Sequence, residues 1–183
     1  MDTAGNLFLG SSRCGGSLVN EWYVVTAGHC VAKARVHQIR ITLGEYILKS
    51  GAEPLPGRTY GASAIKVHPY FKFTPQADRY DVAVVRLNRR VDFAPHISPI
   101  CLPPKHTDLM GRRALVSGWG ALNPGSRLRP KTLQVRRKTF QTHFFLPHDF
   151  WFNGPPDGPF KKDNNMKIIS LQNKLGPSKS IEI

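Results

Sequence analysis

Residues 24–30 read Val-Val-Thr-Ala-Gly-His-Cys, and this stretch carries both a strand signal and a candidate catalytic group. The β-branched Val24 and Val25 are typical of a strand. Ala27-Gly28 then predicts a tight turn that presents His29 at the end of that strand. A histidine held in this way can act as a general base near neutral pH. Taken alone the pattern is weak, because a histidine after a glycine is more often an ordinary loop residue.

A second stretch, residues 80–87, reads Tyr-Asp-Val-Ala-Val-Val-Arg-Leu and places a carboxylate before an apolar strand. A buried carboxylate costs free energy unless it is paired or hydrogen-bonded. An imidazole N–H is a natural partner for Asp81, and such a pairing leaves the other ring nitrogen able to take a proton. Taken alone, Asp81 is more often a turn or capping residue. The two stretches together are far more specific than either one.

Around these stretches the chain predicts many short strands separated by glycine- and proline-containing turns. The predicted strands are residues 17–19, 23–25, 39–43, 64–67, 81–87 and 114–119. This pattern indicates an all-β barrel or sandwich. After about Val135 the pattern changes: residues 139–152 are aromatic without a strand or helix period, and residues 153–159 are rich in glycine and proline. We expect this basic, aromatic tail to be disordered, or ordered only by contact with something else.

Composition sets further bounds. The 183 residues suffice for one domain or two small ones, and no apolar run reaches the ~18–20 residues of a membrane-spanning helix. The first residues show no signal peptide. A net charge of +14 would attract polyanionic partners. The charge is spread along the chain and no nucleic-acid-binding motif accompanies it, so ordinary solvated positive surface is the more common explanation. His143 and His148 lack cysteine or carboxylate neighbours at ligand spacing. We therefore expect no metal, no cofactor and no specific nucleic acid.

The chain resembles the trypsin/chymotrypsin-like serine peptidases over about residues 8–135. The motifs that carry the resemblance are residues 14–19 (Cys-Gly-Gly-Ser-Leu-Val), 25–30 (Val-Thr-Ala-Gly-His-Cys), 43–46 (Leu-Gly-Glu-Tyr), 68–70 (His-Pro-Tyr), 80–87, 97–103 (Ile-Ser-Pro-Ile-Cys-Leu-Pro) and 116–120 (Val-Ser-Gly-Trp-Gly). The resemblance implies that His29 is the general base, that Asp81 orients it and that Cys14 and Cys30 form a disulfide.

The resemblance also implies the architecture. We expect the first antiparallel β-barrel of the double-barrel fold, an incomplete second barrel and an irregular C-terminal tail. Residues 1–135 would be a partial peptidase domain, and residues 136–183 a non-homologous tail. Without a second barrel, the first would expose an apolar face and tend to aggregate. The disulfide needs an oxidising compartment, and family members are secreted, which predicts an extracellular location.

The nucleophile of the family is not matched. Family members carry it in a Gly-Asp-Ser-Gly-Gly segment, and none of the serines after Asp81 follows Gly-Asp or lies between glycines (Ser98, Ser117, Ser126, Ser170, Ser178 and Ser180). Residues 1–10 also lack the Ile-Val-Gly-Gly-like activating terminus. We therefore expect no peptidase activity from this sequence. Cys101 resembles the cysteine that tethers an upstream propeptide in many members, and we expect it to be unpaired here.

Three functions remain open. The first is a secreted endopeptidase, acting on protein or peptide substrates, whose sequence is incomplete here. The second is a catalytically inactive homologue that acts as a binding or regulatory module. The third is a basic protein that binds polyanions. Both His29 and Asp81 are present, which favours an active parent enzyme, because a binding module has no chemical need for the pair.

Overall fold

The structure is a computed structural model of the chain, and it describes residues 4–9, 12–73, 80–104, 107–123, 126 and 128–139. The predicted tail from residue 140 onward, including His143 and His148, lies outside the described residues. No helix in the described ranges has both the length and the apolar character needed to cross a membrane.

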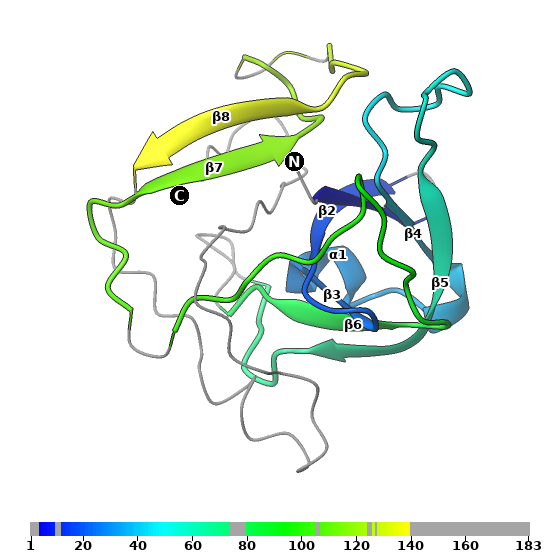
Figure 1. Ribbon diagram of the computed structural model, residues 1–183. Coiled ribbons are helices and arrows are strands. Elements are labelled where there is room, and N and C mark those ends of the chain that lie inside the picture. Colours follow the sequence, from blue (N-terminus) through cyan, green and yellow to red (C-terminus); the bar gives the residue numbers. More distant parts are fainter. Residues whose placement is uncertain are drawn as a thin grey trace.

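Six antiparallel strands form a closed barrel (Figure 1). They are β1 (Ala4–Leu9), β2 (Ser12–Leu18), β3 (Tyr23–Thr26), β4 (Ile39–Leu43), β5 (Arg58–Val67) and β6 (Ala83–Leu87). Their order around the barrel is β1-β2-β3-β6-β5-β4, and β1 closes it by pairing with both β2 and β4. The expected first barrel is therefore confirmed.

The barrel core follows the two-residue period of its strands. In β4, Ile39, Ile41 and Leu43 are at most 2% exposed, whereas Arg40 between them is exposed. In β6, Val85 and the two strand ends are likewise buried, and they meet the β4 side chains in one apolar cluster. Burying each such aliphatic side chain contributes about 1.5–3 kcal/mol. The alternating apolar residues therefore set which side of β4 and β6 faces the core, although Thr42 of β4 is buried as well.

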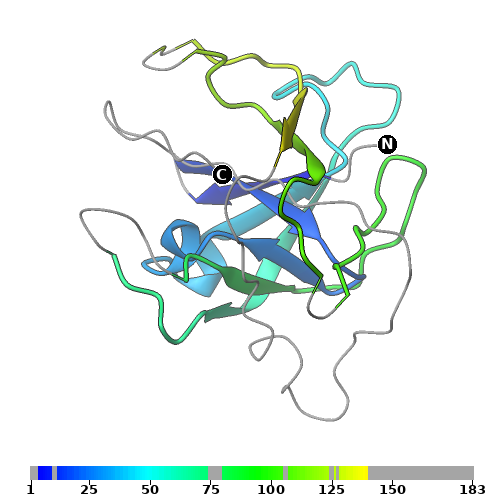
Figure 2. The same ribbon diagram turned by 90° about the vertical axis from the view of Figure 1, so that its left-hand side faces the viewer.

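A two-stranded antiparallel ribbon, β7 (Arg113–Gly118) and β8 (Gln134–Thr139), lies above the barrel in both views (Figure 1 and Figure 2). It is anchored to the loop after β4. The Trp119 indole N–H donates to the Tyr46 carbonyl at 3.1 Å, and the same carbonyl accepts the Leu133 amide at 2.8 Å. Leu48, Trp119 and Leu133 form a small buried cluster at this contact. Within the described residues, this ribbon represents the incomplete second barrel.

Some strand predictions differ from the structure. β1 and β8 were not predicted, β5 begins at Arg58 instead of residue 64, and β6 begins at Ala83 instead of residue 81. The boundary expected after residue 135 falls inside β8, because Lys138 and Thr139 still pair with Ala114 and Arg113 of β7. The expectation of a disordered tail is therefore wrong for residues 136–139, whose backbone order comes from strand pairing.

A short helix, α1 (Gly28–Val31), and a 3-10 turn, η1 (Val36–Gln38), connect β3 to β4. Gly44 ends β4 with a φ of +76°, and an added Cβ would lie 2.5 Å from Cδ2 of His96. Both the backbone conformation and the close approach therefore require glycine here.

Candidate active site

The strand β3 and the helix α1 position His29. Buried Thr26 ends β3, and its hydroxyl donates to the Gly15 carbonyl of β2 at 2.8 Å. Ala27 is extended (φ −73°, ψ 143°), and the chain then turns into α1 at Gly28. An added Cβ at Gly28 would lie 3.2 Å from Oδ1 of Asp81, so glycine permits the close approach of the carboxylate. The turn thus presents His29 toward the segment before β6.

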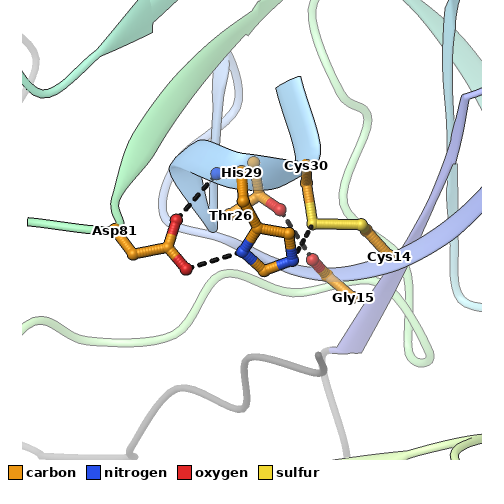
Figure 3. The surroundings of a disulfide bond; sticks show 6 residues. All are labelled: Cys14, Gly15, Thr26, His29, Cys30 and Asp81. Atoms are coloured by element: carbon orange, nitrogen blue, oxygen red, sulfur yellow. Dashed lines mark hydrogen bonds and ion pairs between the residues drawn. A yellow bond between two sulfur atoms is a disulfide. The ribbon is translucent and has the colours of Figure 1, made fainter. Parts of the chain in front are cut away.

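Asp81 engages His29 through both of its carboxylate oxygens (Figure 3). Oδ1 accepts the main-chain N–H of His29 at 2.7 Å, and Oδ2 lies 2.6 Å from ring Nδ1. The two side chains are only 19% and 18% exposed. Because an ionised carboxylate can only accept hydrogen bonds, Nδ1 carries the proton in this pair. In the neutral imidazole, Nε2 is then the nitrogen with the lone pair.

A disulfide between Cys14 and Cys30 ties α1 to β2 beside this pair (Figure 3). Its Cα atoms are 6.3 Å apart, and the pairing is the one that the resemblance implies. The sulfur of Cys30 lies 3.5 Å from Nε2 of His29. A disulfide sulfur has no proton to donate, so this contact becomes a hydrogen bond only when Nε2 is protonated. The bridge therefore restricts the position of the ring without occupying the lone pair of Nε2.

Comparison with known proteins agrees with this geometry. The family model described as Trypsin matches residues 3–143. This chain belongs to the trypsin family. It is 45% identical over 127 residues to Serine proteinase stubble of Drosophila melanogaster, covering 69% of this chain and 16% of that protein. It is 37% identical over 110 residues to Inactive serine protease scarface of Drosophila melanogaster, covering 58% of this chain and 16% of that protein.

Among solved structures, the chain resembles neuropsin, a serine protease expressed in the limbic system of mouse brain. The TM-score is 0.64 at 24% identity, covering 76% of this chain and 59% of that one. At this identity the likeness supports the trypsin-family fold alone. The chain spans about one sixth of each of the two Drosophila relatives.

An aromatic contact also holds the segment that carries Asp81. The Tyr80 ring stacks on His68, with centroids 4.9 Å apart and an interplanar angle of 11°. The His68 main-chain N–H donates to the Val82 carbonyl at 3.0 Å, and Nδ1 of His68 accepts the Tyr70 amide at 3.1 Å. Burial lowers the pKa of His68, which favours the neutral ring. These contacts connect the end of β5 to both neighbours of Asp81.

Tyr80 has a φ of +54°, which is uncommon for a residue other than glycine. The sequence carries no signal for this backbone conformation, and it marks His68 only as part of the family motif His68-Pro69-Tyr70. Sequence reasoning therefore found the two residues in contact, His29 and Asp81, but missed the Tyr80–His68 stack that flanks them.

The Cys14–Cys30 disulfide also decides whether a metal ion can bind beside His29. The donor atoms of Cys14, His29 and Cys30 lie within 4.8 Å of one another. Both sulfurs are bonded to each other in the disulfide, so no thiolate remains to hold a metal ion.

Cys101 is a free, half-buried cysteine. Its proposed role as a tether for another segment stays a prediction.

Proposed function

We propose that these residues supply the His–Asp half of a peptide-hydrolysing centre. His29 acts as the general base and Asp81 as the residue that orients it. The supporting observation is that Asp81 binds both the main-chain N–H and Nδ1 of His29, at 2.7 and 2.6 Å. With Nδ1 protonated, Nε2 can take the proton of an attacking hydroxyl and return it to the leaving amine. The positive imidazolium that forms in between is stabilised by the carboxylate.

This chemistry also needs a nucleophile and an oxyanion hole. No serine of the 183 residues lies in the Gly-Asp-Ser-Gly-Gly segment that carries the nucleophile in this family. We propose that these residues alone do not hydrolyse peptides, because loss of the nucleophile removes most of the rate enhancement. On this proposal residues 1–135, together with the rest of β8, form a partial peptidase domain, and hydrolysis of a protein substrate requires residues beyond those present.

An inactive homologue is the second candidate. Its support is the similarity to a relative named an inactive serine protease, at 37% identity over 110 residues. Such a protein would bind a target without cleaving it. We propose an extracellular location for either candidate, because the Cys14–Cys30 disulfide requires an oxidising compartment. A polyanionic partner, suggested by the net charge of +14, is a separate proposal.

A fluorophosphonate probe tests the first part of this proposal, because it labels only activated serines. Incubated with the folded 183-residue chain, it should label no residue, and peptide substrates should not be cleaved. Labelling of any serine would overturn the assignment of the nucleophile to residues outside the chain.

Transcript sequencing distinguishes the two candidates. A reading frame for Gly-Asp-Ser-Gly-Gly beyond the Leu133 codon would support the endopeptidase, and in that product His29→Ala should abolish cleavage. A transcript without such a frame would leave the binding module as the function.

A further inference from the structure

Three neighbouring strands of the barrel carry exposed basic side chains. The strands β4, β5 and β6 contain four basic and no acidic residues, and Arg89 lies two residues after the end of β6. Arg40 pairs with Gly61 across β4 and β5, and Arg86 pairs with Ala64 across β5 and β6. All five cationic side chains are exposed, and we refer to them together as the β4–β6 basic face: Arg40, Arg58, Lys66, Arg86 and Arg89.

Two of these guanidinium groups lie on aromatic rings. Arg89 lies 4.6 Å from the ring centroid of Tyr60 and donates from Nη2 to the Thr59 carbonyl at 3.1 Å. Arg86 lies 5.2 Å from the ring centroid of Trp22. Such stacking holds a planar guanidinium at a fixed place on the surface.

Two further guanidinium groups are held by main-chain carbonyls. Nη1 of Arg58 donates to the Asp92 carbonyl at 3.0 Å, and Nη1 of Arg40 donates to the carbonyls of His37 at 2.9 Å and Ile39 at 3.1 Å. A guanidinium has five N–H donors, so most of them remain directed to solvent in both side chains. Because the side chains are already ordered, an anionic ligand would lose little of its binding free energy to their immobilisation.

In the part of the chain that the structure describes, no ion pair involves the four arginines of this face (Arg40, Arg58, Arg86 and Arg89). Among the described residues, the ion pair next to it joins Glu21 to Arg90 at a distance of 3.9 Å, and Arg90 is not one of the five. The β7–β8 ribbon is also basic, with Arg113, Arg136 and Arg137. In the described part of the chain, however, no hydrogen bond or ring contact holds those three guanidinium groups. The two surfaces therefore carry similar charge, but hydrogen bonds or ring contacts hold the arginines in place on the β4–β6 basic face and not on the ribbon.

We propose that the β4–β6 basic face binds a sulfated glycan chain. Guanidinium groups form paired hydrogen bonds with oxyanions such as sulfate esters. Neighbouring strands are about 4.8 Å apart, and the partners of Arg40 and Arg86 on β5 are Gly61 and Ala64. The two backbone positions therefore lie roughly 14 Å from each other, within reach of sulfates along one linear chain. This site does not depend on the His29–Asp81 pair, and it gives the separately proposed polyanionic partner a location.

The face is less suited to single-stranded nucleic acid, which binds best where bases can stack on exposed aromatic rings. The rings among the five cations are Tyr60, which is 3% exposed and lies beneath Arg89, and the half-buried Trp22, on which Arg86 already lies. The chemistry therefore favours a ligand recognised through its charges alone.

The test compares two variants of the full chain, each of which removes three positive charges. The first is Arg40→Gln/Arg86→Gln/Arg89→Gln, and the matched control on the ribbon is Arg113→Gln/Arg136→Gln/Arg137→Gln. Binding to a heparin oligosaccharide is measured by titration calorimetry at several salt concentrations. The first variant should lose at least about tenfold in affinity, and its slope of log affinity against log salt should fall by about 2–3. The control should stay within about threefold of the parent.

Equal losses in the two variants would show that only net charge matters and would overturn the proposal. Equally tight binding of fully desulfated heparin, or of a single-stranded DNA of the same charge, would overturn the assignment to a sulfated glycan. If the triple variant unfolds, Arg40→Gln is compared with Arg113→Gln, which also removes one charge, because the hydrogen bonds of Arg40 go to main-chain carbonyls. His29→Ala should bind the oligosaccharide as tightly as the parent does. A failure of the glycan-binding proposal can therefore be told apart from a failure of the proposed hydrolytic centre.

Discussion

Replacing Asp81 with asparagine changes one hydrogen-bonding atom of the His29–Asp81 pair. The amide oxygen can still accept the main-chain N–H of His29, which Oδ1 accepts at 2.7 Å. The amide nitrogen then takes the place of Oδ2, 2.6 Å from Nδ1. Because that nitrogen carries only donors, Nδ1 must lose its proton, and the neutral ring must carry it on Nε2 instead. The general base would then present an N–H where it needs a lone pair.

The energetic cost follows from the type of bond that is lost. A hydrogen bond to a charged group contributes about 1.5–3 kcal/mol, and a neutral one about 0.5–1.5 kcal/mol. Both side chains are less than one fifth exposed, so solvent screens the difference little. Asp81→Asn should therefore lower the free energy of unfolding at neutral pH by about 1–2 kcal/mol.

Nitrogen-15 NMR of the imidazole ring measures the position of the proton directly. At a pH where the His29 ring is neutral, the parent should show a protonated Nδ1 and Asp81→Asn a protonated Nε2. Asp92→Asn, which alters an exposed carboxylate, is the control and should leave the His29 ring unchanged. The same tautomer in the parent and in Asp81→Asn would refute the reasoning.

Two further predictions concern the disulfide and His68. The double variant Cys14→Ala/Cys30→Ala should lose roughly 3 kcal/mol of unfolding free energy in urea titrations, because the bridge joins residues 16 apart and restricts the unfolded chain; a loss below about 1 kcal/mol would contradict this. Burial lowers the pKa of His68 from 6.5, so its contribution to stability is complete above that value and is lost as the pH falls through the lower folded value. His68→Gln should lessen the fall in urea midpoint on acidification, and an equal fall in the two proteins would count against the prediction.

Strands with alternating or β-branched apolar residues were predictable from the sequence. β4 shows this most clearly, since Ile39, Ile41 and Leu43 alternate with Arg40 and Thr42. β8 was not predictable, because Gln134–Thr139 offers only Val135 as an apolar residue and its conformation depends on hydrogen bonds to β7. Local pattern reveals a strand that buries its own side chains, but not one whose order comes mainly from its neighbour.

The same distinction applies to the site. His29 and Asp81 were found because each follows or precedes an apolar strand within a recognisable motif. The Tyr80–His68 stack was not found, since it depends on a positive φ at Tyr80 and on a contact between segments 12 residues apart. Likewise, the ordered arginines of the β4–β6 basic face depend on register. The sequence shows that these residues are basic. Their closeness in space follows from the pairing of β4, β5 and β6.

The pairing of β3 with β6 has a consequence for how the domain could change during evolution. Thr26 pairs with Ala83, three residues before His29 and two residues after Asp81. The main-chain register of these two strands thus aligns the pair, and both strands belong to the first barrel. Insertions or replacements after β6 can therefore accumulate without disturbing the proton-transfer geometry. A one-residue insertion between Asp81 and Ala83 would separate the two side chains, because it shifts the carboxylate relative to the paired strands.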